Sequence, residues 1–267
     1  MLCSLCGART AATADGRCTV CARVRRARAG GLMWTPARLD AVRPVVGLGR
    51  AACVLLGAAA VVDVLAITAG VRNRMLLAEG LDDGFLAVDE ETWDRADMLY
   101  RSAGMLQGLA ILVIAVVFLV WLRRVRLNAE AFDPRAHSMR PGWAIGAWFV
   151  PFGNVWLPYR VTSDIWTASA PADTPGGRSA TPRGLLKAWW ALLVGAEILS
   201  RYAAGFYGKA KTGGDMVRGL DMVAVCDGLE IVAAVLAILV VRRLTEMQTR
   251  RAATGTFPVE RPPLRAH

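Results

Sequence analysis

Four cysteines near the start of the chain form the clearest metal-binding pattern. They make two Cys-x2-Cys pairs, Cys3 with Cys6 and Cys18 with Cys21, separated by eleven residues. Two such turns can place four thiolates in the tetrahedral arrangement of a structural zinc site. The residues between the pairs are poor in hydrophobic side chains, so the metal would supply most of the folding free energy. The spacing predicts a small zinc ribbon that holds a structural Zn ion. A pair of disulfides or a redox switch is the alternative.

Ionisable side chains inside apolar stretches form a second set that could do chemistry. They are Asp63, Glu197, Arg201, Asp227 and Glu230. Such residues cost about 2.5–3.5 kcal/mol each in a membrane helix, so they usually face the interior of a helix bundle. Glu197 lies four residues before Arg201, so the two share one helical face, and the same holds for Asp227 and Glu230, three residues apart. The pattern predicts an intramembrane polar cluster in which Arg201 pairs with Glu197 and Asp227.

One arginine cannot neutralise four carboxylates, which leaves a second interpretation of this cluster open. At least one carboxyl group would stay protonated or would bind a cation. Glu230, Glu197 and Asp63 could then serve an ion- or proton-coupled transporter or a channel component.

Catalytic motifs are not found in the sequence. The chain contains two histidines, His137 and His267, and lacks the nucleophile elbow, the zinc-protease motif and the P-loop. His137 lies in a polar segment, and we interpret it as a loop residue rather than a general base. We therefore expect no enzymatic activity and no catalytic residue.

Membrane helices must position these residues, because the chain is too apolar for a soluble domain of its charge. Of 267 residues, 55% are hydrophobic and 20% are charged, and the mean hydropathy is +0.38. The apolar residues concentrate in four stretches long enough to cross a hydrocarbon core of about 30 Å. These stretches are 47–70, 103–122, 188–207 and 219–241. The sequence predicts an all-α polytopic membrane protein with four transmembrane helices.

The distribution of charge sets the expected orientation. The net charge is +10, and arginines follow the second and fourth stretches at Arg123, Arg124, Arg242 and Arg243. Segment 71–102, between the first two stretches, holds eight acidic residues. By the positive-inside rule, the arginine-rich ends lie in the cytoplasm and the acidic segment lies outside. We expect a protein of the cell membrane, surrounded by membrane lipid, with both termini cytoplasmic.

Segment 142–166 is aromatic and too interrupted to cross the membrane as one helix. Pro151 and Gly153 predict a helix break, because proline removes a backbone donor and glycine loosens the turn. Its tryptophans are typical of the headgroup boundary: Trp143, Trp148, Trp156 and Trp166. We expect a re-entrant or interfacial segment. We interpret Asn154 as a partner for the backbone groups that the break frees, with a ligand contact as the alternative.

A specific block of residues occupies the middle of the chain. It comprises Asn128, Phe132, the run GWAIGAWFVP with Trp143, Trp148 and Pro151, then Asn154, Pro158, and Asp164 to Trp166. This block resembles the bacterial membrane family known as domain of unknown function 4328. The resemblance extends over about Gly47 to Gln248 and implies a membrane location, with no activity or ligand to carry over. The cysteine pairs resemble short ribbons that precede this domain in actinobacterial members.

The chain is therefore expected to divide into four parts: a zinc ribbon (1–25), a basic Gly/Pro linker (26–46), a helical membrane domain (47–248) and a basic tail (249–267). We expect the ribbon to dock a cytoplasmic protein partner while the helices anchor or sense. Arginines at positions 23, 25, 26 and 28 are interpreted as a positive-inside anchor. A membrane-tethered nucleic-acid binder is the remote alternative.

Overall fold

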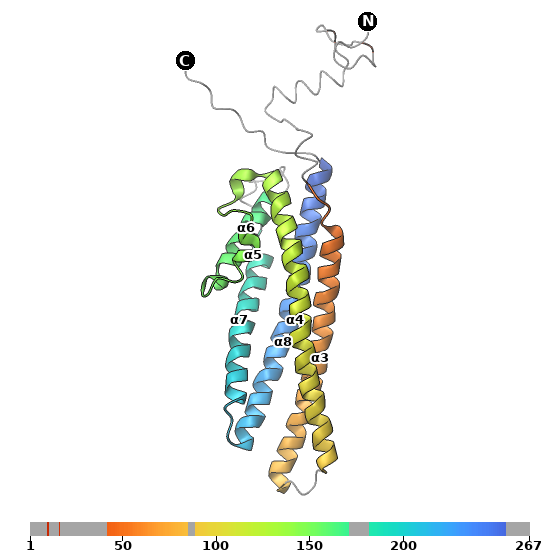
Figure 1. Ribbon diagram of the computed structural model, residues 1–267, viewed down its shortest axis with the longest axis vertical. Coiled ribbons are helices and arrows are strands. Elements are labelled where there is room, and N and C mark those ends of the chain that lie inside the picture. The colour runs from red at the N-terminus through yellow and green to blue at the C-terminus, as the bar shows by residue number, and fades with distance from the viewer. Residues whose placement is uncertain (1–9, 11–15, 17–41, 85–88, 171–181, 255–267) are drawn as a thin grey trace.

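The described part of the chain is built from helices. The computed structural model describes residues 10, 16, 42–84, 89–170 and 182–254. The four cysteines of the predicted zinc ribbon lie outside the described residues. The elements are α3 (Val46–Asp83), α4 (Glu90–Phe132), η1 (Pro134–Ala136), α5 (Trp143–Gly146), η2 (Gly153–Val155), α6 (Leu157–Ser169), α7 (Gly184–Tyr207) and α8 (Gly213–Thr254) (Figure 1).

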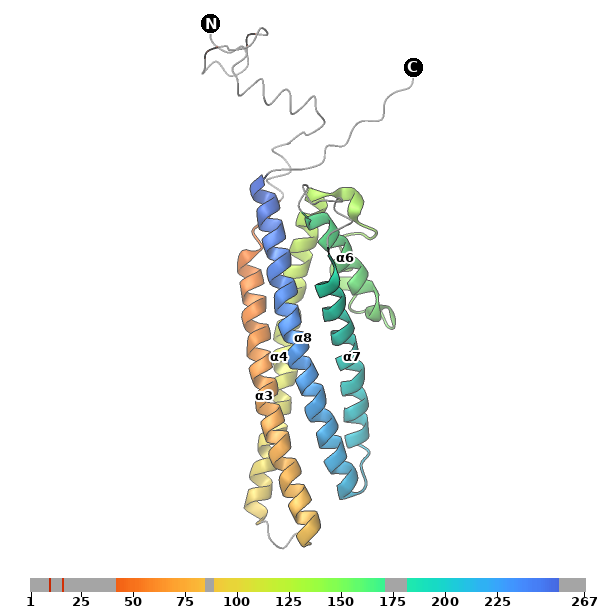
Figure 2. The ribbon, with the colours of Figure 1, turned by 180° about the vertical axis from the view of Figure 1, so that it is seen from behind.

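The four long helices lie side by side and alternate in direction. α8 packs along both α3 and α7, and α3 packs along α4, whereas α4 and α7 share almost no backbone contacts (Figures 1 and 2). The starts of α3 and α7 and the ends of α4 and α8 therefore meet at one end of the bundle. α5 and α6 pack beside that end, against α4 and α8.

Three of the four predicted spans are long and apolar enough to cross a membrane within the described residues. These are α3, α4 and α8, whose most apolar windows have mean hydropathies of 2.3, 2.7 and 2.4. α7 does not belong to this group, because Glu197 and Arg201 lower the hydropathy of its centre. The large apolar side chains on α3 and α4 are mostly exposed, as lipid-facing residues are.

The acidic segment between the first two spans is largely helical. α3 continues to Asp83 and ends at Gly84, whose left-handed backbone (φ 69°) closes the helix, as glycine commonly does. α4 begins after Asp89, whose carboxylate accepts a hydrogen bond from the Thr92 backbone N–H at 3.3 Å. The two helices therefore extend beyond the apolar stretches as a helical hairpin.

Polar side chains lock the opposite end of the bundle. Asn128 on α4 exchanges two hydrogen bonds with the backbone of Arg43 (3.0 and 2.9 Å) and donates a third to Gln248 on α8 (3.2 Å). Gln248 in turn donates to the Val125 carbonyl at 2.9 Å and to Ser169 on α6 at 3.0 Å. Buried amides are tolerated when their donors are satisfied, so this network fixes α4, α6 and α8 relative to one another.

Candidate functional site

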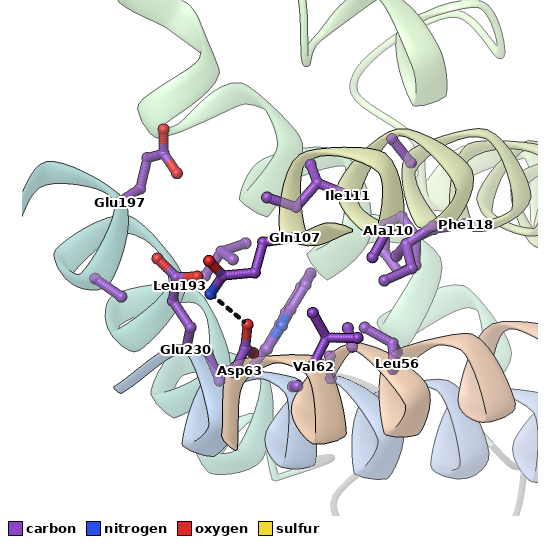
Figure 3. Close-up of a pocket in the computed structure, with 18 of the residues that line it drawn as sticks. Leu56, Val62, Asp63, Gln107, Ala110, Ile111, Phe118, Leu193, Glu197 and Glu230 are labelled. Atoms are coloured by element: carbon purple, nitrogen blue, oxygen red, sulfur yellow. Dashed lines mark hydrogen bonds between the residues drawn. The ribbon is translucent and has the colours of Figure 1, made fainter. Parts of the chain in front are cut away.

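An open cavity of about 390 Å³ lies between the long helices. α3 and α8 form its floor with buried residues that include Leu56, Ala233 and Ala237. α4 and α7 form its sides, and its rim carries exposed side chains, among them Ile111 on α4 and Phe149 in the turn after α5. Since the exposed lining residues belong to α4, α7 and this turn, the cavity opens between α4 and α7. Figure 3 shows the lining.

One end of the cavity is polar. Gln107 on α4 donates from Nε2 to Oδ1 of Asp63 on α3 at 3.0 Å (Figure 3). The same nitrogen donates to Oδ1 of Asp227 on α8 at 3.2 Å. Ser200 on α7 donates from Oγ to Oε1 of Glu230 on α8 at 2.6 Å. The structure thus brings Asp63, Asp227 and Glu230 to one level of the bundle, with neutral donors from α4 and α7 between them.

Arg201 does not take part in this polar end. It pairs with Glu197 one turn earlier on α7, at 2.7 Å, and both side chains are mostly exposed (75% and 57%). The predicted pairing of Arg201 with Asp227 is wrong, because Arg201 lies on the outward face of α7 while Asp227 is buried and faces Gln107. Within residues 42–84, 89–170 and 182–254, no basic side chain forms an ion pair with Asp63, Asp227 or Glu230.

The other end of the cavity is aromatic. Phe118 on α4 contacts Trp148 and Trp189, with ring centroids 5.7 and 6.1 Å apart. Beyond the polar end, Tyr100 on α4 meets Tyr207 on α7 edge to face, with centroids 6.3 Å apart. The Phe118 cluster therefore lies at one end of the cavity, and the Tyr100–Tyr207 pair lies beyond the other. Aromatic pairs of this kind have restricted, well-defined geometry.

The central aromatic segment contains no continuous helix from Ala147 to Trp156. At its tip, Phe152 adopts a left-handed backbone (φ 59°), which is uncommon for a residue other than glycine. Its side chain is 84% exposed. Gly153 is buried beside it, and a Cβ there would lie 2.8–2.9 Å from Leu157 and Val150. The tip is thus a tight turn that presents an apolar side chain outward.

Asn154, Pro158 and Asp164 of this segment differ in their surroundings. Asn154 is exposed and makes no side-chain hydrogen bond with the described residues, so it does not satisfy the backbone of the break. Pro158 is buried in the first turn of α6, where a missing N–H costs little. Asp164 accepts hydrogen bonds from the Ser138 N–H and Oγ, at 2.9 and 2.6 Å, and so ties α6 to the preceding loop.

The tryptophans of this segment divide into two groups by their exposure. Trp166 is buried in the core, and Trp148 turns inward to form part of the cavity wall. Trp143 and Trp156 are exposed and remain available to the interface. The inward pair lies where α5 and α6 pack on α4, and this packing removes the apolar ring surface of both indoles from solvent.

His137 lies between these elements, and its titration gives a testable pH dependence. Burial lowers the pKa of His137, and the Arg126 guanidinium lowers it further, against smaller raising effects from the Ala129 carbonyl, Asp164 and Glu130. The folded protein therefore binds fewer protons than the unfolded chain below about pH 6.5. The contribution of neutral His137 to the free energy of unfolding should therefore be complete above that pH. It should be lost as the pH drops through the pKa of His137 in the folded protein.

We expect the difference in melting temperature between pH 7.5 and pH 5.5 to be smaller in His137→Gln than in the parent. Thermal unfolding in detergent at both pH values measures it. Identical differences in the two proteins would contradict the assignment. His267→Gln is the control, because it tests whether the pH dependence comes from His137 or from the other histidine of the sequence.

Two polar residues of the site were not predicted from the sequence. Gln107 is the one amide within the 103–122 stretch, and Ser200 follows Glu197 by three residues. Neither is ionisable, so a search for charged residues in apolar stretches passes over both. An amide inside the most apolar stretch of the chain was nevertheless an available signal, because unpaired amides are costly in lipid.

The predicted zinc ligands can be placed only in sequence. Cys3, Cys6, Cys18 and Cys21 lie outside the described residues. Within the described ranges, no group of three or more His, Cys, Asp or Glu side chains could hold a metal ion. The other two cysteines, Cys53 on α3 and Cys226 on α8, are free thiols.

Comparison with known proteins gives one match. A family model described as Domain of unknown function (DUF4328) matches residues 86–246, which is more than half of the chain. The match runs from just before α4 into the C-terminal part of α8, and it leaves α3 with Asp63 outside. It is therefore shorter than the resemblance over Gly47 to Gln248. Neither a curated protein nor a solved structure matches the chain.

Proposed function

The chain belongs to the family described as Domain of unknown function (DUF4328), and from this premise we propose that it is a non-enzymatic membrane sensor or docking protein. Its helical bundle binds a membrane-soluble ligand, and its N-terminal ribbon docks a cytoplasmic protein partner. The observation that carries the ligand-binding part is the cavity between α4 and α7. It combines an apolar wall with a few convergent polar groups, as small-molecule sites commonly do.

In this proposal α7 is a fourth membrane span. It has 24 residues, about 36 Å of helix, and it packs along α8 in the opposite direction. Its two exposed charges neutralise each other, which reduces the cost of placing them in the membrane. With four crossings, the ends of α4 and α8 lie on the same side. The arginines that follow the apolar part of each helix make that side the cytoplasm.

The aromatic segment is interfacial in this arrangement. It lies beside the end of the bundle that carries Arg124 and Arg243, and its Phe152 and Trp156 are exposed. Amphipathic aromatic segments of this kind insert into the headgroup boundary. The zinc ribbon, joined to the same end, would then be held at the cytoplasmic surface, where its filled metal site suits docking rather than catalysis.

Binding of a brominated ligand, with and without a side chain that fills the cavity, tests the proposed function. A dodecanol with bromine at the end of its chain should quench the fluorescence of Trp148 and Trp189 in lipid nanodiscs, because both indoles line the cavity. The quenching should reach a plateau as the amount of this alcohol increases. We expect Ala234→Phe to abolish the saturable quenching, since Ala234 lines the cavity. Val235→Phe is the matched control, because Val235 is the next residue on α8 and is exposed to lipid. Linear quenching alone, as from bromine dissolved in the bilayer, would contradict the proposal.

The unpaired carboxylates favour a transporter as the second candidate function. Asp63, Asp227 and Glu230 lack basic partners among the described residues, and such groups can carry protons or cations. Proton or cation flux into proteoliposomes discriminates the two. We expect no flux above that of empty liposomes. Flux that falls when Glu197→Gln is combined with Glu230→Gln would make the bundle a transport pathway and would overturn the sensory function.

A further inference from the structure

We propose that the cavity binds a cationic amphiphile, an alkylammonium whose positive headgroup is held by Asp63 and Glu230 and whose chain extends toward Phe118, Trp148 and Trp189. This inference rests on the proposed function and adds the chemistry of the ligand and its route to the site.

The negative charge of the polar end favours a cationic ligand. Asp63 is 7% exposed, and only its Oδ1 receives a hydrogen bond, from Gln107. Glu230 likewise receives one hydrogen bond, from Ser200 to Oε1. The second oxygen of each carboxylate has no donor among the described residues, and neither group has a basic partner. Asp63 is buried and Glu230 is half-buried, and a carboxylate shielded from water without a counter-charge is costly. A ligand ammonium placed between these oxygens supplies that charge.

The size of the cavity suits a short alkyl chain rather than a bare ion. Its volume of about 390 Å³ far exceeds that of a bare cation and falls in the range of small-molecule pockets. On α8 the lining runs from Glu230 to Ala237, seven residues or about 10 Å of helix. Beyond the carboxylates this lining is apolar, and it ends at the cluster of Phe118, Trp148 and Trp189. A headgroup at one end and an alkyl chain along the rest would satisfy both surfaces.

The opening points to the bilayer as the source of the ligand. It lies between α4 and α7, where Ile111 and Phe149 are 60% and 71% exposed. In a membrane these side chains contact lipid, so a molecule entering between them comes from the hydrocarbon region. The edge-to-face contact of Tyr100 with Tyr207 lies between the polar end and the connection from α7 to α8. A water-soluble ion would have to pass this contact, whereas an amphiphile does not.

The depth of the polar end sets the orientation of the ligand. Asp63 is 13 residues from Arg50, and Glu230 is 12 residues from Arg242, which places both carboxylates about 18–20 Å from that arginine level. The aromatic end lies nearer to it. The headgroup therefore points away from the arginines and the chain points toward them. This is the orientation of an amphiphile in the outer leaflet when the arginines are cytoplasmic.

The experiment compares two probes with the same chain in zwitterionic nanodiscs, a bromine-tipped dodecyltrimethylammonium and the bromine-tipped dodecanol. The Coulomb attraction between the carboxylates and the fixed positive charge favours the ammonium, so we expect its saturable quenching of Trp148 and Trp189 at a mole fraction about tenfold to a hundredfold lower than that of the alcohol. In the double variant Asp63→Asn with Glu230→Gln the two probes should saturate together. Glu246→Gln, an exposed carboxylate farther along α8, should keep the full difference.

The outcomes separate the inference from the proposed function. Equal saturation by the two probes in the parent protein would overturn the cationic ligand and leave the cavity as a ligand site. Saturation by neither probe would overturn both. Displacement of the bromine-tipped ammonium by tetramethylammonium at equal concentration would show a small-cation site and would overturn the amphiphile. Unchanged saturation by the alcohol in the double variant shows that this variant keeps its fold, as expected when a buried charge is removed.

Discussion

Replacing Arg251 with methionine is expected to lower the free energy of unfolding by about 3–5 kcal/mol, because its buried guanidinium serves several acceptors at once. Arg251 lies in the last turns of α8 and is 2% exposed. It donates from Nη1 to the carbonyls of Ala168 and Ala170, the latter at 3.0 Å, and from Nη2 to the carbonyl of Phe132 at 3.1 Å. Its guanidinium carbon also lies 5.2 Å from the centre of the Phe132 ring.

The expected loss of unfolding free energy is large because these carbonyl acceptors lie at the ends of two other helices. Phe132 closes α4, and Ala168 and Ala170 lie at the end of α6, so one side chain ties three helices together. Without the guanidinium, the three buried carbonyls would lose a donor that water cannot replace. Arg251→Lys should fail to rescue stability, since an ammonium lacks the planar fork that reaches separate acceptors.

Denaturant unfolding in detergent measures the effect, and hydrogen exchange of residues 166–170 localises it. Arg250→Met is the matched control, because Arg250 precedes Arg251 on α8 and makes a surface ion pair with Glu246. Exposed pairs contribute little, so this variant should lose less than about 1 kcal/mol. An equal loss in both variants would show that Arg251 acts as an ordinary surface charge.

The proposed zinc ribbon predicts that replacing Cys3 with serine lowers the zinc content from one ion per chain to about none. Structural zinc in small modules contributes about 10–16 kcal/mol of apparent binding free energy, and that binding folds the module. A site of four thiolates that loses one ligand no longer closes the tetrahedron. Metal analysis of the purified protein measures the loss of zinc. Binding of the cytoplasmic partner to the full chain, through residues 1–45, measures the loss of the folded module.

Cys53→Ser is the control for this prediction, because Cys53 lies on α3 and not in the cysteine pairs. It should keep the full zinc content. A parent protein that contains no zinc and has its four N-terminal thiols blocked as disulfides would contradict the ribbon. It would also place the N-terminus in an oxidising compartment, which disagrees with a cytoplasmic location.

The membrane character of the chain follows from local composition, and so it could be predicted. Hydropathy adds residue by residue along a helix and does not depend on neighbouring helices, so 47–70, 103–122 and 219–241 identify α3, α4 and α8. Contacts within one helix follow from its period of 3.6 residues. The i,i+4 spacing of Glu197 and Arg201 accordingly gives the ion pair that the structure contains.

Helix ends were harder to place, because hydropathy changes gradually there. α8 continues through residues 249–254, which the sequence analysis assigned to the tail, and Arg251 is buried in that extension. A charged residue beyond an apolar stretch is expected in solvent, and only the carbonyl groups at the ends of α4 and α6 make its burial favourable.

The site itself depends on the rotation and axial shift of each helix, and only the tertiary structure decides these. The sequence by itself determined that the chain is helical and apolar enough for a membrane, and which carboxylates lie within its apolar stretches. The structure decided that Gln107, rather than Arg201, meets Asp63 and Asp227, and that Trp148 faces a cavity rather than the interface. The physical reason is that contacts between helices depend on how side chains of different helices fit together, a property that no single stretch contains.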